Sequence, residues 1–255
     1  RGARAGAGRR AGAGTSARDD AADAGAEAAQ AALAELAELA GESAALVVVY
    51  ASPRYDLDAL LRGIRRVTGE TPLVGATTVT HFRDGELAPA GQGVAVLAVT
   101  AGRYRFGVSA VTVVDDDLLG AGQALARAAK QDAEPGRSPF SGFLVLVGGP
   151  VRDYQDLLAG THRVLGAAVP IVGGIASIDR PEHRSAVFCG DRVLRDGAVG
   201  VWIGSPEPLR VVRGHGWTAA GAPQVATDVE GTTVRTLGGR DAAESLAGVL
   251  GWTPL

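Results

Sequence analysis

The chain has 255 residues, of which 46% are hydrophobic and 21% are charged, a composition typical of a globular protein with a substantial core. Its net charge of -3 gives no electrostatic reason to expect nucleic acid or a membrane surface as a partner, and no apolar run reaches the ~18 residues that span a bilayer. The single cysteine, Cys189, excludes an internal disulfide and indicates a cytoplasmic protein.

The basic residues are almost all arginines. The sequence contains no methionine, no asparagine and one lysine, Lys130. These three residue types have A/T-rich codons, so a bacterial genome of high GC content explains the bias. The arginines therefore need no joint functional explanation.

Helix and strand patterns alternate along most of the chain. Residues 1–10 form a low-complexity Arg/Gly/Ala tail that is predicted to be disordered. Strands, helices and a final hairpin are then predicted in the same order twice, first at 11–16, 20–40, 46–50, 56–67, 72–76 and 93–99, and again at 103–113, 117–131, 143–147, 153–165, 170–174 and 197–203. Aspartates open the first helix of each half, at 19–20 and 115–117, where capping explains them better than a metal cluster.

The repeated order comes with repeated phrases. "TPLVGATT" (71–78) returns as "VPIVGGIAS" (169–177), and the prolines of matching motifs lie 97 or 98 residues apart. A period this long indicates a duplicated half-domain, with repeats at about 11–104 and 105–204. The predicted fold class is α/β, with two β-α-β-α-β-β units and mixed sheets in αββα layers. The alternative is one continuous sheet with helices on both sides.

Residues 205–255 depart from this pattern. A strand is predicted from residue 208, then a hairpin turned at Glu230-Gly231, then a helix at 240–251. We expect this segment to be the beginning of a C-terminal α+β domain that the chain cuts short. Its apolar residues, among them Val225 and Leu246, are then expected to be exposed.

Several catalytic signatures are absent from the sequence. It has no Gly-Lys pair for a P-loop, no G-x-S-x-G, no H-E-x-x-H and no paired cysteines. No metal site and no cofactor are therefore predicted, and Cys189 is interpreted as a buried thiol without reactivity.

Small and polar residues gather instead where strands end. In α/β sheets such loops bind ligands, because glycines leave backbone amides accessible and arginines form bidentate hydrogen bonds with carboxylates. The alternative is that they only form turns. The predicted ligand-binding residues are Ser52, Arg54, Gly75, Thr77, Thr78, Gly148, Gly149, Arg152, Gly173, Gly174, Ser177 and Asp179.

The motifs resemble a known family. The stretch at 46–78, together with "PIVGGIAS" and "DGAVGVWI", is similar to the FIST domain, and the tail at 225–251 resembles the start of its C-terminal partner domain. The resemblance implies an intracellular sensory domain of signal transduction that binds small ligands, amino acids among them. The chain departs from the family at Ala76, where many members have cysteine, and at 79–82.

We therefore expect a non-catalytic sensor of an amino acid or another small carboxylate, with a downstream signalling protein as partner. Two alternatives remain open. One is an enzyme acting on a small acid in the same cleft between the repeats, and the other is a protein-interaction scaffold without a ligand.

Overall fold

A computed structural model describes residues 11–83, 86–87, 93–112, 117–133, 138–150, 154–178, 184–214, 216 and 218–252. The chain divides into a larger unit, Arg1–Pro150 with Gln155–Arg210, and a smaller unit, Val151–Tyr154 with Val211–Leu255. The predicted tail at 1–10 lies outside the described residues.

The larger unit contains the two predicted repeats. The first consists of β1 (Ala11–Ser16), α1 (Ala21–Ala40), β2 (Ala44–Ala51), α2 (Leu57–Thr68), β3 (Leu73–Thr77), β4 (Phe82–Arg83), β5 (Glu86–Leu87) and β6 (Val94–Thr100). The second consists of β7 (Arg105–Thr112), α3 (Leu118–Asp132), β8 (Phe140–Gly148), α4 (Gln155–Leu165), β9 (Ile171–Ile175), β10 (Val187–Cys189), β11 (Arg192–Leu194) and β12 (Gly197–Ser205). The order of elements is the same in both, as the sequence predicts.

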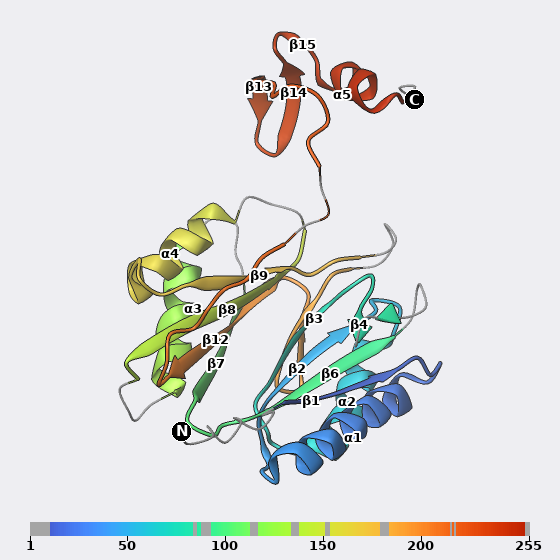
Figure 1. The fold of residues 1–255 in the computed structure, drawn as a ribbon, viewed down its shortest axis with the longest axis vertical. Coiled ribbons are helices and arrows are strands. Elements are labelled where there is room, and N and C mark those ends of the chain that lie inside the picture. Colours follow the sequence, from blue (N-terminus) through green and yellow to red (C-terminus); the bar gives the residue numbers. More distant parts are fainter. Residues whose placement is uncertain are drawn as a thin grey trace, which may run out of the picture. The chain divides into compact units, whose positions relative to one another are not determined.

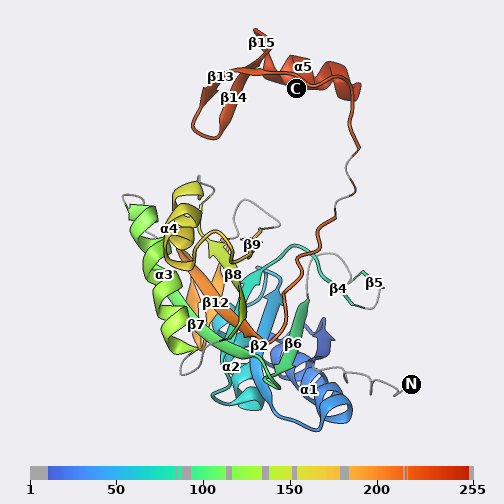
Figure 2. The ribbon, with the colours of Figure 1, turned by 60° about the vertical axis from the view of Figure 1, so that its left-hand side comes forward.

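Two mixed sheets pack face to face with helices on the outside (Figures 1 and 2). The sheets have the strand orders β1-β6-β2-β3-β10-β11 and β7-β12-β8-β9. Between them lies an apolar layer to which Val48 and Val74 contribute from one sheet and Leu146 and Val201 from the other. The αββα prediction is confirmed, and the single continuous sheet is excluded.

The proline-led strands occupy equivalent places. β3 pairs in parallel with β2, and β9 pairs in parallel with β8. In each sheet the central strand of the repeat is thus followed by its neighbour through a helix, α2 or α4, which is the usual connection between parallel strands. The duplication is therefore present in the structure as well as in the sequence.

One pairing crosses between the repeats. The hairpin β10–β11 comes from the second repeat, yet β10 pairs antiparallel with β3 of the first, with Phe188 opposite Gly75. The Phe188 side chain is fully buried in the core beneath α1 and α2. Local pattern alone does not predict this exchange.

Paired glycines let the helices of each repeat touch. A Cβ placed on Gly63 of α2 would lie 2.0 Å from the Ala22 carbonyl oxygen of α1. A Cβ on Gly160 of α4 would likewise lie 2.0 Å from the Leu119 carbonyl oxygen of α3. Both pairs of backbones approach too closely for any side chain, so the two glycines have the same packing role.

Carboxylates of α1 and α3 accept hydrogen bonds from two edge strands, and carboxylates just before these helices cap their N-terminal ends. Glu35 of α1 accepts a hydrogen bond from the Ala13 amide of β1 at 2.8 Å, and Asp132 of α3 accepts one from the Val108 amide of β7, also at 2.8 Å. Asp20 and Asp117 cap α1 and α3. The capping interpretation of these two aspartates is confirmed, and both outer edges have an amide satisfied from within the repeat.

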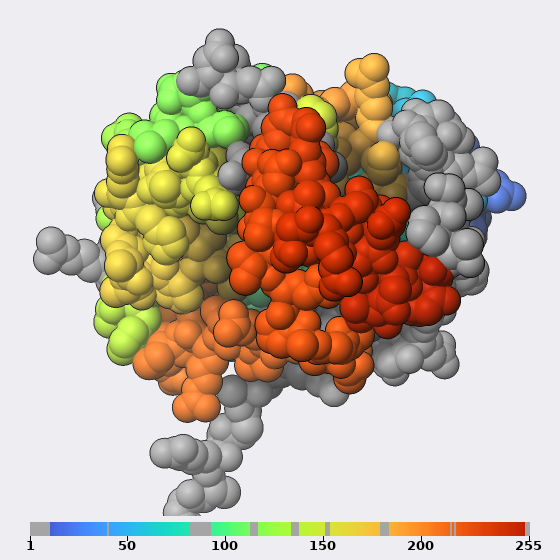
Figure 3. Space-filling view, turned by 90° about the horizontal axis from the view of Figure 1, so that it is seen from above, coloured from blue at the N-terminus to red at the C-terminus, as the bar shows by residue number. Residues whose placement is uncertain are grey.

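The smaller unit contains β13 (Ala226–Glu230), β14 (Thr233–Leu237), β15 (Arg240–Asp241) and α5 (Ala242–Leu250), which form part of the red surface in Figure 3. The hairpin turns at Gly231 with φ +56°, as predicted. The strand predicted from residue 208 is wrong, because the described residues of 206–220 form no strand. Pro206 and Pro208 lack amide donors, which disfavours ladder formation there. Four apolar side chains predicted to be exposed are exposed, namely Val225, Val229, Leu246 and Leu250.

Candidate functional site

The ends of the two proline-led strands meet in the larger unit. The Thr77 hydroxyl donates a hydrogen bond to the Ser177 carbonyl oxygen at 3.0 Å, and the Ser177 amide donates to the Thr77 carbonyl oxygen at 3.0 Å. The Val79 amide donates to the Ser177 hydroxyl oxygen at 3.1 Å. The two phrases that the sequence repeats are therefore joined side by side, and we call residues 77–79 and 176–178 the strand-end junction.

A cavity of about 360 Å³ opens beside this junction. Five of the predicted ligand-binding residues line it, namely Thr77, Thr78, Gly173, Gly174 and Ser177. Its remaining described lining is Tyr50, Ala76, Leu144, Leu146, Val172 and Ile175. The cavity combines hydroxyl groups and strand backbone with an apolar wall.

The apolar wall is not among the features predicted from the sequence. Tyr50 and Leu146 lie on the central strands β2 and β8 and belong to the apolar layer between the sheets, so the available signal is their place on that face. Burial raises the pKa of the Tyr50 phenol, which keeps its hydroxyl protonated as a neutral donor.

Two predicted residues after β2 lie away from the cavity lining. Ser52 is buried; its amide donates to the Gly93 carbonyl oxygen at 2.8 Å, and its hydroxyl oxygen accepts from the Arg54 amide at 3.3 Å. Arg54 is exposed at the start of the turn into α2. These bonds describe a turn, which is the alternative that the sequence left open for this loop.

Gly75 has a packing role in β3. It is buried in β3 between β2 and β10, and a Cβ there would lie 2.1 Å from the Val49 carbonyl oxygen. A Cβ on Gly173 would lie 1.7 Å from the Val145 carbonyl oxygen. The glycine shared by the two phrases is therefore required by the close approach of the parallel neighbour strand.

The glycines after β8 also form a turn outside the lining. Gly148 is buried at the end of β8, and Gly149 adopts a φ of +115°. The Ser185 hydroxyl accepts from the Gly149 amide at 3.0 Å and donates to its carbonyl oxygen at 2.9 Å. Arg152 and Asp179 lie outside the described residues.

The described residues give no support for a reactive cysteine or a metal site. Cys189 is half-buried in β10, and burial raises the pKa of its thiol, so the reactive thiolate is disfavoured. No three His, Cys, Asp or Glu side chains of the described ranges are grouped so that they could hold a metal ion. No helix in those ranges is both long and apolar enough to cross a membrane.

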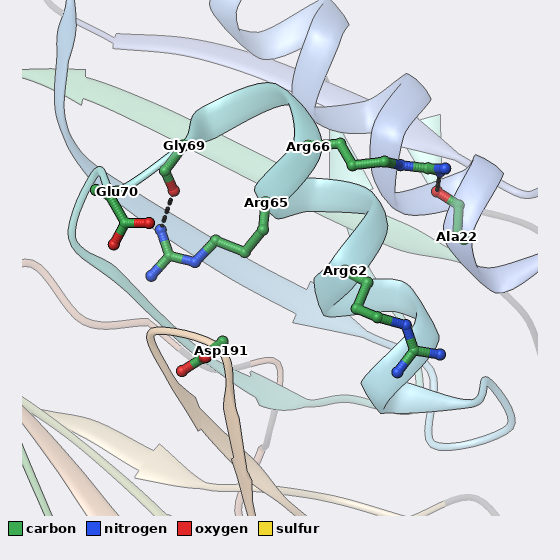
Figure 4. A pocket seen from close by; sticks show the side chains of 7 residues that line it. All are labelled: Ala22, Arg62, Arg65, Arg66, Gly69, Glu70 and Asp191. Atoms are coloured by element: carbon green, nitrogen blue, oxygen red, sulfur yellow. Dashed lines mark hydrogen bonds between the residues drawn. The ribbon is translucent and has the colours of Figure 1, made fainter.

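A second, larger cavity of about 650 Å³ lies beside the C-terminal end of α2 (Figure 4). Arg62, Arg65 and Arg66 line it, in an i, i+3, i+4 spacing that the sequence displays as "RGIRR". Arg65 donates to the carbonyl oxygens of Gly69 and Thr71 at 2.7 and 2.6 Å, whereas Arg66 points toward α1. Arg65 thus closes the helix end, and the guanidinium groups do not converge on one point.

Thr77 is the residue on which the strand-end junction depends, because its hydroxyl donates to Ser177 and accepts from the Ala186 amide at 3.1 Å. Replacement by valine keeps the shape and leaves the buried Ala186 amide and the half-buried Ser177 carbonyl without this partner, so we expect a loss of about 1–3 kcal/mol in the free energy of unfolding. Urea denaturation measures it. Thr78→Val, which removes one bond to Thr80 within an exposed turn, should cost less. Equal costs for the two variants would contradict this role.

The fold and the junction define a class of internally duplicated α/β domain with a cavity where its halves meet. Residues 45–240 match the FIST N domain, so the chain belongs to the FIST family, whose domains are sensory domains of signal transduction. None of the curated proteins gives a match to the chain. The match reaches into the smaller unit, and the assignment of 205–255 to a C-terminal FIST domain stays a prediction.

Proposed function

We propose that this FIST domain is a non-catalytic cytoplasmic sensor that binds a small ligand in the cavity at the strand-end junction. The observation that carries the proposal is that both repeats line one cavity and are hydrogen-bonded to each other at its rim. A ligand that contacts both strand ends stabilises one arrangement of the repeats. Such a difference in affinity between two arrangements is what a sensor needs.

The lining suggests the chemistry of the ligand. Leu144, Leu146 and Val172 offer an apolar surface, and the hydroxyl groups of Tyr50 and Thr78 offer hydrogen bonds. A molecule with a short apolar part and a polar end fits this lining. We therefore infer an amino acid or another small carboxylate, with its apolar part against the leucines.

The experiment begins with a thermal-shift screen of the full chain against the amino acids and small dicarboxylates. For a ligand that raises the melting temperature, Tyr50→Phe should weaken binding about two- to tenfold in calorimetry, because one hydrogen bond contributes roughly 0.5–1.5 kcal/mol. Tyr104→Phe is the matched control, since Tyr104 is also half-buried but stacks on Phe106 away from the cavity lining. Equal effects of the two variants, or no ligand in the screen, would contradict the proposal.

The counter-charge of the carboxylate is a separate part of the proposal. Arg54 and Arg152 remain the proposed partners, and a charge-assisted bond contributes about 1.5–3 kcal/mol. Alanine at the contributing arginine should therefore weaken binding about tenfold to a hundredfold. If both single variants keep full affinity, the ligand is held by hydroxyl and amide groups alone.

A further inference from the structure

We propose that β9 receives an extended segment of a partner protein as an additional antiparallel strand. The proposal rests on a comparison between the two repeats. It concerns the edge of β9, a strand whose residues 172–175 also line the cavity at the strand-end junction. In the first repeat, the chain itself supplies such a strand. In the second repeat, no described strand takes the equivalent place.

The two proline-led strands differ in their neighbours. β3 lies inside its sheet, between β2 and β10, whereas β9 ends its sheet and pairs with β8 alone among the described strands. The edge strands β1 and β7 each have an amide bonded to a carboxylate of the adjacent helix, Glu35 or Asp132. For β9 we find no such carboxylate contact within the described part of the chain. Unprotected edges of this kind are where extended segments add to sheets.

Side chains at equivalent positions of the two repeats differ in their exposure to solvent. Leu61 of α2 is 1% exposed, and Leu158, which is 97 residues later in α4, is 38% exposed. Thr77 at the end of β3 is 2% exposed, and Ile175 at the end of β9 is 53% exposed. Leu61 belongs to the same core cluster as Phe188 of β10. Leu158 and Ile175 are thus exposed at positions whose equivalents are buried in the first repeat, where β10 pairs with β3.

The pairing on β3 predicts the register on β9. The Gly190 amide donates to the Leu73 carbonyl oxygen at 2.9 Å, and the Thr77 amide donates to the Ala186 carbonyl oxygen at 2.9 Å. The corresponding backbone groups of β9 belong to Ile171 and Ile175. An incoming strand would bond to these groups in the same antiparallel direction.

The same pairing predicts the chemistry of the partner segment. Phe188 lies opposite Gly75, and its Cδ2 is 2.8 Å from a Cβ placed on that glycine. Gly173 leaves the equivalent space on β9. The partner segment should therefore be extended and apolar, with an aromatic residue opposite Gly173 and an apolar neighbour for Leu158.

The first repeat has a hairpin in the equivalent position, but its described residues do not pair with β9. β4 pairs with β5 in a separate two-stranded sheet. The occupant that we propose is therefore a segment from another polypeptide. Self-association through β9 is one of the outcomes that the experiment separates.

The experiment uses the full chain and a fluorescent peptide that copies residues 184–191, with alanine in place of Cys189. We expect saturable binding in fluorescence anisotropy. Methylation of the peptide amides that face β9 should weaken binding at least tenfold, because it removes ladder bonds and keeps the side chains. Equal binding of the methylated peptide, or no binding of the parent peptide, would overturn the proposal.

A matched pair of protein variants tests the surface. Leu158→Glu should weaken peptide binding about tenfold or more, whereas Leu39→Glu should not, although Leu39 of α1 is equally exposed at 39%. Sedimentation shows whether the free chain is a dimer, and a dimer that Leu158→Glu dissociates would replace the partner with a second copy. The peptide titration contains no small ligand, so failure of the small-ligand screen is distinguishable from failure of this proposal.

Discussion

Replacement of Phe188 by alanine is expected to lower the free energy of unfolding by about 3–5 kcal/mol. The ring is fully buried beneath α1 and α2, although the residue belongs to the second repeat. Its removal leaves a cavity over Gly75, where β10 joins β3. Urea denaturation followed by far-UV circular dichroism measures the change as a lower transition midpoint.

Phe140→Ala is the control for this substitution. Phe140 begins β8 and is 42% exposed, so its loss should cost less than roughly 1 kcal/mol. The comparison isolates burial, since both changes remove the same side chain from a strand of the same unit. Similar midpoints for the two variants would show that the β10–β11 hairpin is not seated on β3.

Gly63→Ala is expected to destabilise the chain by about 1–3 kcal/mol. The new methyl group would lie 2.0 Å from the Ala22 carbonyl oxygen, so α1 and α2 must move apart. Alanine in a helix is intrinsically better than glycine by roughly 0.8–1 kcal/mol, so a net loss requires the steric cost to exceed that gain. Thermal unfolding of the variant measures the sum.

The controls for Gly63 come from the same chain. Gly160→Ala meets the Leu119 carbonyl oxygen at 2.0 Å and should behave alike. Gly248 of α5 has no heavy atom within 4 Å of the added methyl group, so Gly248→Ala should be neutral or slightly stabilising. If all three variants are stabilised, the two helix crossings are looser than the structure indicates.

Much of the fold follows from local signals. Apolar runs such as 46–50 predict buried central strands, helical spacing predicts α2, and the common period predicts two equal units. The place of the site also follows, because equivalent strands in a duplicated fold end at corresponding places. Thr77 and Ser177 lie together for this reason.

The rest depends on contacts that no local pattern encodes. The exchange of β10 onto β3 joins Val187 to Ala76 across more than a hundred residues. The packing role of Gly75 is not readable from the sequence, because a glycine needed for close strand approach has the same letter as one that exposes an amide. The wall at Tyr50 and Leu144 requires knowledge of which strand face meets the other sheet.

The crossing of β10 onto β3 also sets an order of events during synthesis. When the first repeat leaves the ribosome, its strand β3 has a bare edge and the core beneath α2 lacks Phe188. That edge stays open until Val187 to Leu194 have been made, after most of the second repeat. A ribosome that stalls within the second repeat therefore leaves a nascent chain with an exposed strand edge that is prone to aggregation. When synthesis continues, β10 of the second repeat pairs with β3 and completes the sheet of the first repeat.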